Sequence, residues 1–158
     1  MLPSMEQESF AQEYTIEKKQ EEYAQDNVFL LRDKEGSLIA RHNIYPLSTE
    51  NVLNFFVNST NSIYKYRHYP VFGGYLESYQ RGKGIGMRMW EYCEEDFFNN
   101  QDTSYLRFIL DIDNKNKWAT KHVSELVEEL NKRGAQVHMI AQKEDWEKKF
   151  MGILLFEK

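Results

Sequence analysis

The 158-residue sequence contains a single cysteine, Cys93, and only three prolines. One thiol cannot form an internal disulfide, and the lack of a disulfide framework is typical of a reducing compartment. No apolar run approaches the roughly 18 residues of a membrane span. The first ten residues, MLPSMEQESF, hold no apolar stretch of the kind that a secretory signal contains. We therefore expect a cytoplasmic protein without a membrane-spanning segment.

Charge is distributed unevenly along the chain. The net charge is −5, and residues 1–26 account for all of it, with seven acids against two lysines. Residues 60–90 carry five basic side chains against one acid. A duplex-binding surface makes many phosphate contacts, which a neutral body with one basic region does not supply. The pattern favours a small, multiply charged anionic ligand over nucleic acid.

Hydrophobic residues make up 41% of the chain and aromatic residues 15%, enough for the core of one domain over residues 1–158. Ser4 and Gln7 have capping-box spacing, and the segment 4–25 contains no glycine or proline. We therefore expect an acidic helical arm within residues 1–26. The patterns that follow it predict a hairpin of strands at 28–32 and 37–45, a short helix at 50–58 after Ser48, and extended segments at 63–69 and 71–77.

From residue 71 onward the predicted elements alternate. Apolar residues at helical spacing (Gly86, Trp90, Cys93 and Phe97) predict a helix after the glycine-rich turn at 81–86. The remaining patterns predict strands at 106–112, 137–141 and 153–156, a helix from 118 to Arg133-Gly134, and a short helix at 144–150. The sequence thus predicts an α/β fold in which helices flank a central sheet.

The turn Arg81-Gly82-Lys83-Gly84-Ile85-Gly86, between a strand and a helix, is the sharpest chemical feature. Its alternate glycines allow close backbone approach, and the following helix directs free N–H groups and the positive end of its dipole at a ligand. The spacing matches neither the Walker loop nor the dinucleotide fingerprint G-x-G-x-x-G. A phosphate or pyrophosphate cradle is the main interpretation. A plain strand-to-helix turn, or a nucleotide-phosphate site unrelated to coenzyme A, stays open.

The segment from Leu76 to Gly86, LESYQRGKGIG, resembles the acetyl-CoA loop of the GNAT family of N-acetyltransferases, V-x-P-x-x-[QR]-G-x-G-[IV]-[GA]. Leu76 stands at the valine of that pattern and Ser78 at its proline. About 30 residues downstream, LDIDNKNKWA is similar to the family's second segment, L-x-V-x-x-x-N-x-x-A, with Asn116 and Ala119 in register. The resemblance covers residues 71–158 and implies a GNAT-like acyl-CoA N-acyltransferase fold with a mixed central sheet.

The resemblance also implies a cofactor site and a reaction. Acetyl-CoA would be the co-substrate, and its acetyl group would pass to a primary amine of a small molecule or peptide. The strand from Leu76 to Ser78 would bond the pantetheine arm, and Asn116 would face the cofactor. The backbone of the loop and helix start would bind the pyrophosphate, a role that falls on Arg81, Gly82, Lys83, Gly84, Ile85, Gly86 and Met87.

An amine that attacks a thioester must lose a proton, and the departing thiolate must gain one. Glu77, on the strand that leads into the loop, is the first candidate base, and Asp111 and Asp113 come second. His122 and Tyr79 are the candidate thiol acids, because Val123 occupies the helix position where the family usually has a tyrosine.

Other side chains with possible chemistry have structural interpretations. Cys93 lies on an apolar helix face, which predicts an inert buried thiol. The four histidines are scattered without metal-ligand spacing, so we expect no metal site. Aromatic residues between 64 and 79 could form a stacking platform or pack as a two-sided strand.

Two functional hypotheses therefore stand. The first is an acetyl-CoA-dependent N-acetyltransferase. The second is a catalytically inactive GNAT-like domain that binds coenzyme A or a protein partner. The sequence does not decide the acceptor or the oligomeric state.

Overall fold

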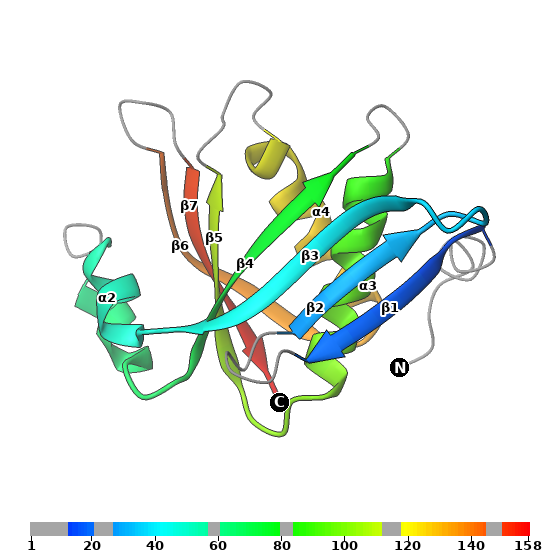
Figure 1. Cartoon of the computed structure of the whole chain (residues 1–158). Helices are drawn as coiled ribbons and strands as arrows, with labels where there is room; N and C mark the ends of the chain where they lie inside the picture. Colours follow the sequence, from blue (N-terminus) through cyan, green and yellow to red (C-terminus); the bar gives the residue numbers. More distant parts are fainter. Residues whose placement is uncertain (1–12, 21–26, 57–60, 80–83, 112–117, 145–149) are drawn as a thin grey trace. The chain divides into compact units, whose positions relative to one another are not determined.

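A computed structural model describes residues 13–20, 27–56, 61–79, 84–111, 118–144 and 150–158. Within these ranges the strands hydrogen-bond in the order β1-β2-β3-β4-β5-β7-β6 (Figure 1). β4 and β5 run parallel, whereas the pairs β1–β2, β2–β3, β5–β7 and β6–β7 are antiparallel. The predicted α/β fold with a mixed sheet and flanking helices is therefore confirmed.

The strands are β1 (Thr15–Gln20), β2 (Asn27–Arg32), β3 (Leu38–Leu47), β4 (Val71–Ser78), β5 (Tyr105–Asp111), β6 (Gln136–Glu144) and β7 (Phe150–Glu157). The helices are α2 (Thr49–Asn54), the 3-10 helix η1 (Asn61–Tyr66), α3 (Ile85–Asn99) and α4 (Trp118–Lys132).

The chain divides into two compact units. Unit 1 comprises Met1–Tyr45 and Gly74–Gln101, and unit 2 comprises Pro46–Gly73 and Asp102–Lys158. The single domain expected over residues 1–158 stays a prediction. Among the described helices, none has the length and apolar character needed to cross a membrane.

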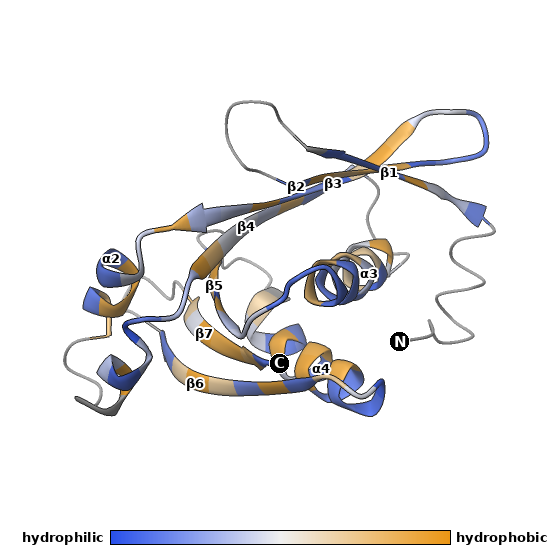
Figure 2. Ribbon diagram, turned by 90° about the horizontal axis from the view of Figure 1, so that it is seen from below, coloured by the Kyte–Doolittle hydropathy of each residue, from blue (hydrophilic) through white to orange (hydrophobic). Residues whose placement is uncertain are grey.

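In unit 1, helix α3 lies against one face of the antiparallel strands β1 to β3 (Figure 2). The β2–β3 turn is tight because Asp33 Oδ1 accepts hydrogen bonds from the N–H groups of Glu35 and Ser37, and Gly36 adopts a φ of 85°. The register places Phe29 opposite His42. Both side chains are buried, so this face of the hairpin supplies the interior under α3.

Strand β1 corrects the expected N-terminal helix. Residues 15–20 form an edge strand, with Ile16 opposite Leu31 and Lys18 opposite Phe29. Lys18 Nζ lies over the Phe29 ring, 5.6 Å from its centroid, and 2.9 Å from Asp96 Oδ2 on α3. Because a lysine occupies this position opposite the buried Phe29, the alternation of apolar and polar residues that predicts a strand is not visible in the sequence. The other residues of the predicted arm, 1–12 and 21–26, lie outside the described residues.

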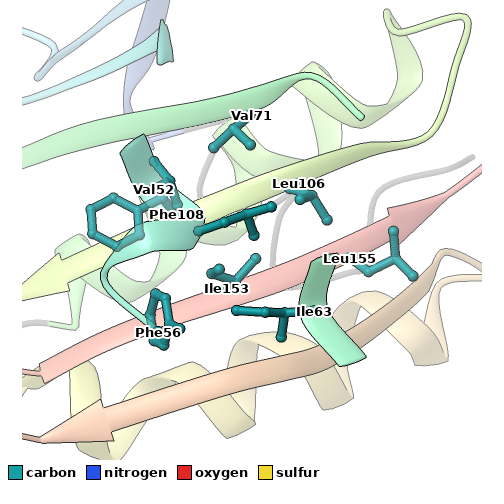
Figure 3. Close-up of a cluster of buried hydrophobic side chains, with 9 residues drawn as sticks. Val52, Phe56, Ile63, Val71, Leu106, Phe108, Ile153 and Leu155 are labelled. Atoms are coloured by element: carbon teal, nitrogen blue, oxygen red, sulfur yellow. The ribbon is translucent and has the colours of Figure 1, made fainter. Parts of the chain in front are cut away.

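Unit 2 is built on the antiparallel strands β5, β7 and β6, with α4 packed on β6 and β5. Its core joins side chains from α2, η1, the start of β4, β5 and β7 (Figure 3). The members are Val52, Leu53, Phe56, Ile63, Val71, Leu106, Phe108, Ile153 and Leu155. β4 enters this unit through parallel pairs of Val71 with Leu106 and Phe72 with Arg107.

Helix ends in unit 2 confirm two predictions. Ser48 caps α2, because its Oγ accepts the Asn51 N–H at 3.3 Å. Helix α4 ends before Gly134, which adopts a φ of 94° as a left-handed C-terminal residue does.

Two other predictions are wrong. The segment expected to be extended at 63–69 begins as η1, with a bond from the Arg67 N–H to the Tyr64 carbonyl. The short helix expected at 144–150 is contradicted at both ends, since Glu144 closes β6 and Phe150 opens β7. Residues 145–149 lie outside the described residues.

Candidate functional site

The N-terminus of α3 has the features of an anion-binding site. Gly84 is its N-cap residue and makes no side-chain capping bond, and the first turn contains no acidic residue. The first helical bond runs from the Arg88 N–H to the Gly84 carbonyl at 3.2 Å. The amides of Ile85, Gly86 and Met87 come before that bond, so the helix itself gives them no acceptor. These three N–H groups and the helix dipole favour a negatively charged ligand.

Gly84 is required for its backbone conformation rather than for space. Its φ is 68°, in the left-handed region, and a Cβ built there would meet nothing within 4 Å. Residues with a side chain pay about 1–2 kcal/mol in that region. The preceding loop residues of the predicted cradle, Arg81, Gly82 and Lys83, lie outside the described residues.

The end of β4 positions the candidate base. The Tyr79 N–H donates to the Ile39 carbonyl at 2.8 Å, which fixes the register between β3 and the antiparallel β4. Counting back from that bond places Arg41 opposite Glu77 and Asn43 opposite Tyr75. These residues share the face that points away from α3, because side chains alternate along a strand.

Leu76 and Ser78 alternate with Glu77 and belong to the other face of β4, with His42 and Ala40. All four are partly or wholly buried. The two positions expected to contact pantetheine through their backbone are therefore anchored by side chains that point into unit 1.

Glu77 and Tyr79 form a hydrogen-bonded pair. The Tyr79 hydroxyl donates to Glu77 Oε2 at 3.1 Å, and both side chains reach solvent. The pKa of Tyr79 is raised above 10.0 by partial desolvation and then by the hydrogen bond to the Glu77 carboxylate, which the nearby Arg41 charge partly offsets. The phenol therefore holds its proton firmly while it donates to the carboxylate. The candidate base and a candidate thiol acid, which the sequence offered separately, are thus hydrogen-bonded to each other.

Under this sheet, α3 is held by buried polar groups. His42 Nε2 on β3 lies 3.8 Å from Glu94 Oε1 on α3, and the two side chains are 2% and 0% exposed. The Trp90 Nε1–H donates to the same Glu94 oxygen at 3.3 Å. The His42–Glu94 contact joins α3 to β3, whereas the Trp90 bond lies within α3 and orients the Glu94 carboxylate.

The structure gives other predicted residues local partners. His122 Nδ1 lies 2.9 Å from Glu125 Oε2 on the surface of α4. Asp111 Oδ2 accepts the Ala119 N–H at 3.3 Å, at the start of α4, and its role as a second candidate base stays a prediction. Cys93 is fully buried, as expected, and Val123 is buried as well. Asp113 and Asn116 fall outside the described residues.

Sequence reasoning missed Arg41, His42 and Glu94. Glu94 follows Trp90 by four residues and so lies on the apolar stripe of α3, which was a usable signal. Arg41 and Asn43 are two residues apart on a strand and therefore share a face, but the register that sets Arg41 opposite Glu77 is not written in the sequence. Within the described ranges, no three His, Cys, Asp or Glu side chains are arranged to hold a metal ion.

Comparisons with known proteins give a similarity of structure. No family model matches the chain, and no curated protein matches it. Among solved structures, a GCN5-related N-acetyltransferase from Kribbella flavida is similar over all of this chain and 80% of its own, at 12% identity and a TM-score of 0.48. An agmatine N-acetyltransferase is similar over 83% of this chain and 76% of its own, at 10% identity and a TM-score of 0.45.

A third similar structure is TofI in a ternary complex with an inhibitor and MTA, at 10% identity and a TM-score of 0.47 over 88% of this chain and 68% of its own. For several further acetyltransferases the chain spans only 63–68% of their length. Most of these similar structures are described as acetyltransferases. Because identities are 10–14% and these TM-scores are below 0.5, the proposals below rest on this chain's own residues.

Proposed function

We propose that the protein is an acetyl-CoA-dependent N-acetyltransferase that acts on a primary amine. The observation that carries the proposal is the placement of a carboxylate–phenol pair, Glu77 and Tyr79, on the strand that leads into the glycine-capped N-terminus of α3. One end of this segment offers backbone N–H groups to a pyrophosphate, and the other offers a proton acceptor. Both belong to unit 1.

The residues divide the chemistry as follows. The N–H groups of Ile85, Gly86 and Met87, with the loop before them, would bind the pyrophosphate of acetyl-CoA. The amine nitrogen bonds to the thioester carbonyl carbon, the C–S bond breaks, and the proton of the amine passes to the Glu77 carboxylate. Tyr79, which donates a hydrogen bond to Glu77, is the candidate acid for the departing thiolate, and the proton that Glu77 accepts can then return to the phenol. The assignment of His122 as that acid stays a prediction.

Calorimetric titration with acetyl-CoA tests the cofactor site, with coenzyme A and ATP as comparison ligands. We expect acetyl-CoA and coenzyme A to bind more tightly than ATP, and Gly84→Glu to abolish that binding by placing a negative charge and a strained backbone at the helix start. Gly134→Glu is the matched control, because Gly134 also has a positive φ and open space around its Cα. Equal losses in the two variants would contradict the site.

Turnover of an amine library then tests the base. Removing a general base typically costs about 10²–10⁴-fold in rate. We expect Glu77→Gln to lower kcat by that factor, while acetyl-CoA affinity stays within about twofold. Glu50→Gln, which removes an exposed carboxylate on α2, should change neither quantity. An unchanged kcat in Glu77→Gln would exclude Glu77 from the mechanism.

The second candidate function is a coenzyme A-binding domain without transfer activity. The buried Val123, at the position of the family's tyrosine, favours it. This alternative predicts tight acetyl-CoA binding with no acetylated product for any amine, so the same two experiments separate the functions.

A further inference from the structure

Four side chains gather where β3 and β4 pair, on the sheet face that points away from α3. Arg41 comes from β3, and Tyr75, Glu77 and Tyr79 come from β4 and the residue after it; together they are called the Arg41–Glu77 cluster. Tyr75 and Tyr79 are 53% and 50% exposed, unusually high for aromatic side chains in a sheet. Exposed aromatic rings flanked by charges of both signs are typical of a ligand-binding surface.

The two charged side chains of the cluster, Arg41 and Glu77, lie close together on adjacent strands. Directly opposed residues on antiparallel strands have Cβ atoms about 5 Å apart, and the register makes Arg41 and Glu77 such a pair. The Tyr79 hydroxyl donates to Glu77 Oε2 at 3.1 Å, which joins Tyr79 to this pair. No ion pair of Arg41 occurs in the part of the chain that the structure describes.

Arg41 is also oriented. Its Nε donates to Asn43 Oδ1 at 3.0 Å, and both residues are partly buried. This bond uses one edge of the guanidinium and leaves the two terminal nitrogens for another group. A guanidinium offers paired N–H groups that match a carboxylate.

We propose that the Arg41–Glu77 cluster binds the acceptor as an aromatic α-amino acid, with the carboxylate on Arg41 and the ammonium on Glu77. As far as acetyl transfer is concerned, this inference rests on the proposed function; the binding itself does not. The ammonium and carboxylate of an α-amino acid are separated by one carbon, which suits two opposite charges on adjacent strands. Tyr75 and Tyr79 offer aromatic surface to a planar side chain.

Three matched probes test the proposal by NMR titration of the full chain without acetyl-CoA. Phenylalanine carries both charges, phenethylamine lacks the carboxylate, and 3-phenylpropanoate lacks the amine. We expect phenylalanine to bind at least about tenfold more tightly than either, with chemical-shift changes at Arg41, Tyr75 and Glu77. Arg41→Gln should abolish its advantage over phenethylamine, and Glu77→Gln its advantage over 3-phenylpropanoate. These side chains are exposed or partly exposed, so the variants should fold.

Arg67→Gln, which removes an exposed arginine on the turn after η1, is the control and should change no affinity. Equal affinity for phenylalanine and phenethylamine, no binding of any probe, or an Arg41→Gln variant like the wild type would overturn the proposal. Binding of phenylalanine that follows the expected pattern, but without N-acetylphenylalanine when acetyl-CoA is added, would support the amino-acid site and count against the transferase function. The two failures are therefore distinguishable.

Discussion

The interiors of the two units differ in chemistry. The core of unit 2 consists of aliphatic and aromatic side chains, and its buried cation, Arg107, donates to the carbonyls of Phe72 and Phe108. The interior of unit 1 holds His42, Glu94 and Glu95 close to α3. Apolar packing is non-directional, whereas a hydrogen-bonded polar group fixes an orientation. The unit that carries the candidate site is thus also the one whose interior holds buried carboxylates among its apolar side chains.

This difference between the interiors fits the role proposed for α3 in binding a pyrophosphate. A helix whose N-terminus must meet a pyrophosphate has to keep both its axial position and its rotation. The contact of Glu94 with His42 on β3 resists both a slide and a turn of α3, because it depends on particular atoms, and the Trp90 bond within α3 orients the Glu94 carboxylate. In unit 2, strands β5 and β7 are buried between layers, and close packing of the side chains around them is enough to stabilise them.

The largest expected effect comes from emptying the apolar interior of unit 2. Phe156 is fully buried and stacks on Tyr105 with ring centroids 4.9 Å apart. Phe156→Ala should lower the free energy of unfolding by about 3–5 kcal/mol, since it loses apolar burial and leaves a cavity. Urea denaturation measures the loss, and Phe156→Leu should recover much of it. A loss as small as that of a surface substitution would mean that unit 2 does not depend on this packing.

The buried polar contact of unit 1 should behave differently. Glu94→Leu should cost about 3 kcal/mol, because Trp90 loses its hydrogen-bond acceptor and His42 loses the buried carboxylate 3.8 Å from its Nε2. The double variant His42→Leu with Glu94→Leu should regain most of that stability, since replacing both members of a buried pair is often close to neutral. Urea denaturation of the two single variants and the double variant measures the coupling. Additive losses would show that the pair is not a unit.

The elements with a clean period could be predicted from the sequence. Helices α3 and α4 and strands β2 to β5 follow apolar spacing, and Ser48 and Gly134 mark ends by known local chemistry. Strand β1 was missed because four of its six residues are charged or amide side chains, as edge strands often carry to prevent pairing. Segment 61–66 was missed because its tyrosines favour strands in general, while local i to i+3 bonds decide here.

The candidate site was predictable only in part. Glu77, Tyr79 and Gly84 could be found because they lie within one short motif. The partners Arg41 and His42 come from β3, more than 30 residues earlier in the chain, and sequence spacing does not reveal a cross-strand register. The His42–Glu94 contact depends on how α3 packs on β3, which is a property of the folded structure.

Two glycine substitutions of intermediate effect test whether the N-terminus of α3 in unit 1 binds acetyl-CoA or is a plain strand-to-helix turn. Gly84→Ala and Gly134→Ala should each cost about 1 kcal/mol, because both force alanine into a left-handed conformation with open space around it. Only Gly84→Ala should also weaken acetyl-CoA binding, by calorimetry, because it shifts the amides that would hold the pyrophosphate. Similar affinities in the two variants would leave Gly84 with a purely conformational role.

The smallest expected effect is on how the stability of the protein depends on alkaline pH, and it concerns tyrosines of unit 1. Two tyrosines of unit 1 have a raised pKa: Tyr92, through partial burial and then the neighbouring Asp96, Cys93 and Glu95, and Tyr79, through partial desolvation and Glu77. Above about pH 10 the unfolded chain loses the Tyr92 proton while the folded chain keeps it. The folded state then binds more protons, so stability falls as the pH rises, and below that pH Tyr92 contributes no slope.

Tyr92→Phe should therefore flatten the loss of stability between about pH 10 and the raised pKa of Tyr92, with little change at neutral pH. Thermal denaturation across that range measures the slope, and Tyr45→Phe serves as a control from β3. A flattened slope would mean that the partial burial of Tyr92, together with the charges of Asp96 and Glu95 on the same helix, raises its pKa in the folded state. An unchanged slope would mean that the fold does not raise the pKa of Tyr92.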